Sequence, residues 1–115
     1  MQYMLLIYSD ETAAQKRSER DGAELMAAYG AYGEAMRKAG IAFSGNRLRP
    51  SASATTVRLA DGNSKVLNGP YAETKEQLGG YYLIDVPDLD AALAWAARCP
   101  GASHGVVEVR PVWSM

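Results

Sequence analysis

The spacing of apolar residues along the chain predicts strands at both ends and helices between them. Residues 3–8, Tyr-Met-Leu-Leu-Ile-Tyr, form a continuous apolar run, which is typical of a central strand buried on both faces. Residues 23–39 repeat apolar side chains at helical spacing, and Gly40 follows them as a residue suited to end a helix. The polar segment 11–21 between these two elements is compatible with either a loop or a short helical turn.

The middle of the chain alternates in the way that strands do. Residues 41–48 predict a second strand. Residues 55–59 and 65–67 predict a hairpin, because the pair Asp61-Gly62 between them favours a tight turn.

The last third of the chain predicts two strands and a second long helix. Residues 72–78 are compatible with one or two helical turns, and residues 80–86 form the clearest strand. Asp88 is placed to cap the second helix. The apolar stripe expected to be buried on this helix consists of Leu89, Ala92, Leu93 and Ala96. Residues 106–112 alternate as a final strand.

This order of elements predicts an α+β, ferredoxin-like fold, with an antiparallel sheet and two helices on one of its faces. The other face of the sheet, where we expect Tyr82, Val57 and Leu6, is too apolar to remain bare. Pairing of two sheets in a two-fold homodimer is the simplest cover.

Composition limits the classes of protein to consider. The 115 residues fit a single domain, 1–115, and the formal net charge of -1 gives no basic cluster of the kind that binds nucleic acid. Cys99 is the single cysteine, so no intramolecular disulfide is possible, which fits a cytoplasmic protein. We expect no signal peptide, because no basic segment or long apolar segment precedes the first strand, and no apolar run is long enough to cross a membrane.

Residues 68–82 concentrate the unusual residues of the chain, with a turn, a charged segment and a double glycine. Glu73 and Lys75 in this segment would act as a proton acceptor and an anion contact at a pocket, or simply lie on a solvated turn. His104 is the single histidine, and it would serve either as a general base at a pocket rim or as an ordinary loop residue. The Gly79-Gly80 pair favours a bulge or a close approach of two backbones.

The chain is rich in tyrosine, which suits a pocket for a planar or polar small molecule as well as ordinary core and interface packing. The tyrosines predicted to contact such a ligand are Tyr8, Tyr29, Tyr32 and Tyr71. We expect no metal and no cofactor, because neither a pair of His and Cys ligands nor a phosphate-binding glycine pattern is present.

The stretch NGPYAETKEQLGGYYLIDVPDLDAALAWAARCP, followed by HGVVEVRPV, closely resembles the DGPF-domain proteins of the YCII-related superfamily. The resemblance extends from the YMLLIY strand to the C-terminal VEVRPV. The four residues that give the domain its name are here Asn68-Gly69-Pro70-Tyr71, which removes a charge and adds a hydroxyl group.

The resemblance implies a bacterial protein of unknown function with a ferredoxin-like fold that dimerises as a dimeric α/β-barrel. Genes of the family often lie beside sigma-factor genes, which implies an association with sigma-factor signalling. Some relatives carry a histidine on the first helix that is proposed as a catalytic acid/base, whereas that region here holds Tyr29 and Tyr32. A tyrosine is a poor general base at neutral pH.

Three functions remain open at this point. The sequence favours a homodimeric small-molecule-binding or regulatory protein, since it contains no assembled catalytic set. The alternative is a cofactor-independent enzyme that uses acid/base chemistry with His104 and Glu73. The third is a protein-interaction module, for example one that contacts a sigma factor.

Overall fold

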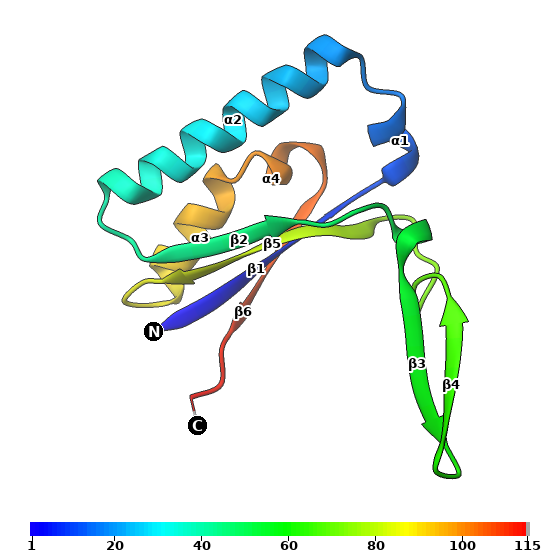
Figure 1. Cartoon of the computed structure of the whole chain (residues 1–115). Helices are drawn as coiled ribbons and strands as arrows, with labels where there is room; N and C mark the ends of the chain where they lie inside the picture. Colours follow the sequence, from blue (N-terminus) through cyan, green and yellow to red (C-terminus); the bar gives the residue numbers. More distant parts are fainter. Residues whose placement is uncertain (115) are drawn as a thin grey trace.

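The computed structural model describes residues 1–114, and its main helices cover one face of a four-stranded antiparallel sheet (Figure 1). The strands of this sheet are β1 (Gln2–Ser9), β2 (Phe43–Arg47), β5 (Gln77–Asp85) and β6 (Val106–Pro111). The helices are α1 (Glu11–Gln15), α2 (Glu19–Lys38), α3 (Leu89–Arg98) and α4 (Gly101–His104). The strand order β2-β5-β1-β6, with α2 and α3 as the long connections, confirms the predicted ferredoxin-like α+β fold.

Strand β1 is central, because it pairs with β5 on one side and β6 on the other. Its residues alternate: Leu5 and its neighbours on one face are buried under the helices, whereas Leu6 and its neighbours on the other face are partly exposed. The expected burial on both faces is therefore wrong for the single chain, because no second layer covers the face that carries Leu6.

Helix α2 begins at Glu19, four residues before the predicted start, because the Ser18 side chain accepts a hydrogen bond from the backbone N–H of Asp21. It ends as predicted at Gly40, which has φ of 75°. The N–H groups of Gly40 and Ile41 donate to the carbonyls of Arg37 and Met36, which is the Schellman pattern. The segment that the sequence left open thus contains α1 and the first turn of α2.

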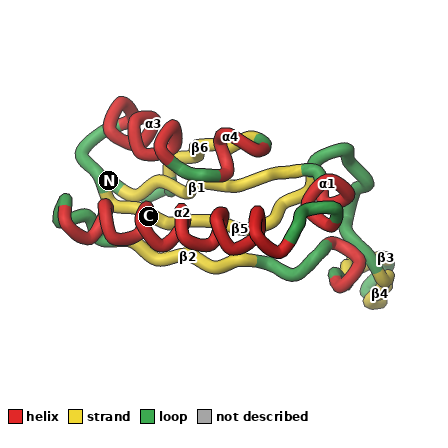
Figure 2. Tube along the Cα trace, turned by 90° about the horizontal axis from the view of Figure 1, so that it is seen from above, coloured by secondary structure: helices red, strands yellow, loops and turns green. Residues whose placement is uncertain are grey.

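Viewed from above, α2 runs along β2 and β5, while α3 and α4 lie beside it over β1 and β6 (Figure 2). The buried core between these layers consists of Tyr3, Leu5, Ile7, Tyr32, Met36, Ile84, Val86, Ala92, Ala96 and Cys99. The predicted stripe of α3 is only half right, because Leu89 and Leu93 are each 48% exposed. Small residues face the sheet here and let α3 approach it closely, which turns the leucines toward solvent.

Strands β3 (Thr55–Ala60) and β4 (Asn63–Asn68) form a separate two-stranded hairpin. Its turn uses Asp61 and Gly62, both at positive φ, as the sequence predicted. The hairpin projects from one end of the main sheet, on the side away from the helices (Figure 1). Val57 therefore lies on this arm, and Tyr82 lies on the helix-covered face opposite Leu5, so two of the three residues expected on the open sheet face are elsewhere.

Residues 69–76 form an irregular loop, so the helical turns predicted at 72–78 are wrong. Strand pairing explains part of the difference: Gln77 and Leu78 pair with Ser9 and Tyr8 of β1, which holds the end of the predicted helical segment in an extended conformation. The register shifts between Ile7 and Tyr8, opposite Gly79, which confirms the predicted bulge at the double glycine. No helix within residues 1–114 is both long and apolar enough to cross a membrane.

Replacing Ile84 by alanine should lower the free energy of unfolding by about 2–5 kcal/mol, because the side chain is fully buried between the sheet and α2. Urea denaturation at a fixed protein concentration measures the change. The matched control Leu93→Ala removes a half-exposed side chain and should cost about 0.5 kcal/mol. Equal losses in the two variants would contradict this description of the core.

Candidate functional site

The two halves of α2 cover different parts of the sheet. Toward the C-terminal end of the helix the sheet presents large side chains such as Ile84, and Met36 of α2 is fully buried against the core. Toward the N-terminal end the helix-facing positions of β2 and β5 are Gly45 and Gly80, which offer no side chains. Residues 19–31 of α2 contain no buried side chain. This half of the helix therefore stands over a hollow.

Both glycines are required by the backbone around them. A Cβ atom at Gly45 would lie 2.5 Å from the carbonyl oxygen of Tyr81 and 2.7 Å from the ring of Tyr82. A Cβ atom at Gly80 would lie 3.1 Å from the carbonyl oxygen of Asn46. Larger residues cannot fill the hollow from below without moving the strands, so the sequence keeps it open.

The hollow is a cavity of about 490 Å³, which we call the inner cavity. Ile7, Gly45, Gly80 and Tyr82 belong to its sheet side, and Leu25 and Tyr29 of α2 line its helix side. At Gly101 of α4 a Cβ atom would lie 2.6 Å from Ile7 and 2.9 Å from the Tyr29 hydroxyl, so α4 closes the cavity tightly on that side. Volumes of about 300–1,000 Å³ are usual for small-molecule pockets.

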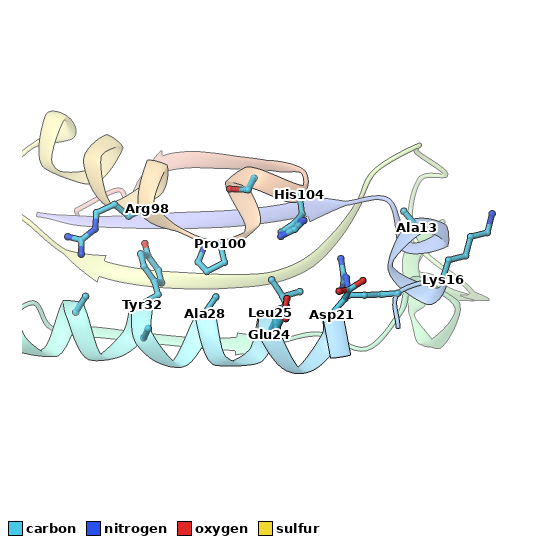
Figure 3. A pocket seen from close by; sticks show the side chains of 14 residues that line it. Ala13, Lys16, Asp21, Glu24, Leu25, Ala28, Tyr32, Arg98, Pro100 and His104 are labelled. Carbon is cyan, nitrogen blue, oxygen red and sulfur yellow. The ribbon is translucent and has the colours of Figure 1, made fainter. Parts of the chain in front are cut away.

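A shallower groove of about 810 Å³, which we call the outer groove, runs between α2 and the α3–α4 segment (Figure 3). Leu25, Ala28 and Tyr32 of α2 point toward Pro100 and His104 across it. The inner cavity and the outer groove share Arg17, Leu25 and His104 in their linings, so the two spaces adjoin there.

Helix α1 closes the end of the inner cavity that lies farthest from the core. Its Glu11 carboxylate accepts hydrogen bonds from the N–H and the hydroxyl of Ser51, both at 2.7 Å. The Glu11 N–H donates to the side-chain oxygen of Gln77 at 3.0 Å, and the Gln77 amide donates to the Thr74 carbonyl at 2.6 Å. Glu11 thus ties α1 to the chain segment before β3 and to the start of β5.

The rim of the inner cavity is cationic. Arg17 follows α1, Arg47 ends β2, and Arg49 lies two residues farther along the chain, and all three line the cavity. None of them forms an ion pair with a carboxylate in residues 1–114. Glu11 is the carboxylate in this lining, and Ser51 already occupies both of its oxygens.

Two tyrosines between α2 and the sheet are held in their protonated form. Burial, followed by the neighbouring Cys99 thiol, raises the pKa of both Tyr29 and Tyr32. The Tyr32 hydroxyl donates to the Trp95 carbonyl at 2.7 Å. Tyr29 lines the inner cavity, but its hydroxyl hydrogen-bonds with Cys99 and the Gly101 backbone, and it is unsuited to act as a general base at neutral pH.

The residues that the sequence singled out lie in three separate places. His104 and Tyr29 line the inner cavity, and Tyr32 lines the outer groove beside His104. Tyr8 lies on the open face of the sheet, between Leu78 and Val106. The three remaining candidates, which line neither the inner cavity nor the outer groove, are Tyr71, Glu73 and Lys75.

These three are exposed around the loop that joins β4 to β5. The ring of Tyr71 lies 5.7 Å from the Arg58 guanidinium of the hairpin. Within one chain, His104 and Glu73 therefore do not share a cavity.

We did not identify the arginines at the cavity rim from the sequence. We also missed Gly45 and Gly80 on the sheet side of the cavity, which we call the glycine floor. Arg47 and Arg49 are two residues apart at the end of a strand, a spacing that places side chains on one face. That signal was available, but only the pairing of β2 with β5 reveals that this face lies under α2. Within residues 1–114, no group of three or more His, Cys, Asp or Glu side chains is arranged to hold a metal ion.

Comparison with known proteins relates the whole chain to one protein family. The family model described as "YCII-related domain" matches residues 1–115. An uncharacterized protein of Rhizobium meliloti (strain 1021) is 41% identical over 118 residues, which cover 97% of this chain and 92% of that protein.

The Cys99 thiol should react with a disulfide reagent at pH 8 about tenfold or more slowly in the native protein than in urea. It is 1% exposed, and burial raises its pKa, so little of the reactive thiolate is present or accessible. Release of the chromophore from the reagent measures the rate. In a Cys99→Ala background, the exposed control Ser103→Cys should react quickly without urea. Equally fast reaction of native Cys99 would contradict the burial described here.

Proposed function

We propose that this chain, which belongs to the YCII-related domain family, is a homodimeric protein that binds a small molecule in the inner cavity. The observation that carries the proposal is the glycine floor under α2. Protein interiors are normally packed to the density of organic crystals, so a cavity of about 490 Å³ beneath a long helix calls for an occupant. Leu25 and the ring of Tyr29 would contact such a ligand from the helix side.

The dimer is supported by the extended form of the single chain. Its Cα radius of gyration is 16.1 Å, whereas a compact chain of this length has about 13 Å. Its accessible surface is 8191 Å², which exceeds the value of about 6,100 Å² for a monomer of this mass by about 2,000 Å². An excess of this size is what each partner of an obligate dimer would bury.

The position of the apolar surface supports the same partner. Leu6 of β1 and Leu83 of β5 lie close together on the open face of the sheet. Val57 and Val66 are paired on one face of the projecting hairpin. A two-stranded hairpin is marginally stable in water by itself, so the arm needs a surface to pack on. The sheet face of a second copy offers one, and the tail with the exposed Trp113 projects to the same side (Figure 1).

A finer assignment to the DGPF-type proteins is supported by the turn Asn68-Gly69-Pro70-Tyr71 at the base of the hairpin. Gly69 has φ of 107°, a conformation that favours glycine, and its N–H donates to the Ala54 carbonyl at 2.6 Å. This geometry supports a structural role for the motif. The sigma-factor association rests on the family resemblance, the cytoplasmic location rests on the single Cys99, and both stay predictions.

The alternative function, acid/base catalysis by His104 and Glu73, requires both side chains at one cavity. Residues of a partner copy would have to supply the second group, because Glu73 of the same chain lines neither space that His104 lines. Small-molecule binding needs no such contribution, so we prefer it.

Replacing Leu25 by tryptophan should weaken ligand binding about tenfold or more, because Leu25 lines the inner cavity and the larger side chain would project into the space that the ligand occupies. A thermal-shift screen of small metabolites on the wild-type protein identifies ligands, since one present at 100-fold its Kd adds about 2.7 kcal/mol of stability. Ala27→Trp is the matched control, because Ala27 is exposed on the same helix and lines neither space. A ligand that binds the Leu25→Trp variant with unchanged affinity would show that the cavity is not its site.

The wild-type protein should have twice the 12.4 kDa chain mass in light scattering after size exclusion. Leu6→Asp, which places a charge on the open sheet face, should convert it largely to monomer because burying an unpaired carboxylate is costly. Leu93→Asp makes the same change on an exposed position of α3 and should leave the dimer intact. A monomeric wild type at micromolar concentration, or a dimeric Leu6→Asp variant, would argue against the proposed interface.

A further inference from the structure

We infer that the ligand of the inner cavity is a small molecule with a carboxylate or phosphate group attached to an apolar ring or chain. This inference rests on the proposed function, since it names the class of ligand for the same cavity. It is carried by the charge, the hydrogen bonding and the apolar surface of the cavity lining.

The cavity rim has cationic side chains that the protein itself does not neutralise. Arg20, Arg37 and Arg110 pair with carboxylates on the surface. Arg17, Arg47 and Arg49 pair with none within residues 1–114, although they come from different parts of the chain and meet at one cavity. The guanidinium of Arg47 has only a long 4.0 Å contact with the Met26 sulfur atom. Three arginines beside one space form a field that favours an anion.

The acidic groups nearby form no ion pair with the three arginines of the cavity rim. The two oxygens of Glu11 accept the Ser51 hydrogen bonds, so this carboxylate holds the loop that carries Arg49 and does not pair with the arginine. Glu24 lines the outer groove and pairs with Arg20 at 3.3 Å. Asp21 also belongs to the outer groove and is absent from the lining of the inner cavity.

The remaining wall of the cavity is apolar and aromatic. Ile7, Leu25 and the ring of Tyr82 offer carbon surface, while the arginines gather where α1 and the end of β2 close the space. A ligand with both an acidic group and an apolar body fits this division, because guanidinium groups bind carboxylate and phosphate oxygens in pairs. A bare inorganic anion would leave the apolar wall without a contact.

Isothermal titration with matched probes tests the inference. Phenylacetate and phenyl phosphate present the two acidic groups on one ring, phenylacetamide is the neutral counterpart, and inorganic phosphate is the anion alone. We expect at least one aromatic anion to bind about tenfold or more tightly than phenylacetamide, which is the effect of one charge-assisted hydrogen bond. We also expect it to bind about tenfold or more tightly than inorganic phosphate, because burial of the ring adds apolar contact. Comparison of the two aromatic anions decides between carboxylate and phosphate.

Arginine variants locate the anion. Arg47→Met and Arg49→Met should each weaken binding of the aromatic anion about tenfold or more and leave any binding of phenylacetamide unchanged. Arg47→Lys should retain part of the affinity. Lys38→Met, which removes one charge at the far end of α2, about 18 Å along the helix from the Met26 that Arg47 contacts, is the matched control and should have no effect. Unchanged unfolding midpoints show that the variants are folded.

The outcomes separate this inference from the proposed function. Equal affinity for phenylacetamide and the anions, with no effect of the arginine variants, would overturn the anionic class while leaving the cavity as a binding site. Equal affinity for inorganic phosphate and phenyl phosphate would overturn the apolar body of the ligand. Probes that bind Leu25→Trp as well as wild type would overturn the site itself, and failure of all four probes on the wild type would count against both proposals.

Discussion

The close approach of β2 to β5 at two glycines is the constraint on which the rest of the site depends. Because a Cβ atom would clash at Gly45 and would be tightly placed at Gly80, the sheet offers little side-chain volume to fill the space under the first half of α2. The ring of Tyr82 occupies the next position and meets Tyr32 edge-on at 5.4 Å, so packing resumes there. The helix is thereby held firmly at its C-terminal half and stands clear of the sheet at its other half, where the cavity lies.

The open end of the inner cavity is held by a second set of contacts, because the half of α2 above the cavity gains little stability from packing. Glu11 supplies it by joining α1 to Ser51 and Gln77 through charge-assisted and neutral hydrogen bonds. These contacts bring the chain segment with Arg47 and Arg49 beside the segment with Arg17. The Glu11 carboxylate uses both of its oxygens in the bonds to Ser51, and the three arginines form no ion pair within residues 1–114.

The sequence predicted the secondary-structure elements better than it predicted the tertiary contacts around them. The β1 run, the Gly40 helix end, the Asp61-Gly62 turn and the bulge at Gly79 follow from local chemistry, and all are present. The helical turns at 72–78 failed because pairing of Gln77 with Ser9, a contact across the chain, outweighs local preference. The site was harder still: His104 and Tyr29 were found by residue type, whereas the glycine floor has meaning only once the strand register is known.

The inner cavity and the exposed apolar strand residues lie on opposite faces of one sheet. The cavity lies between the sheet and α2, and the apolar strand residues around Leu6 face the other way, beside the projecting hairpin (Figure 1). A partner on the open face would therefore leave the cavity unobstructed. The two faces are nevertheless joined through Ser51, which binds Glu11 at the cavity rim and precedes the hairpin by only a few residues. The segment around Ser51 therefore belongs both to the rim of the cavity and to the base of the hairpin.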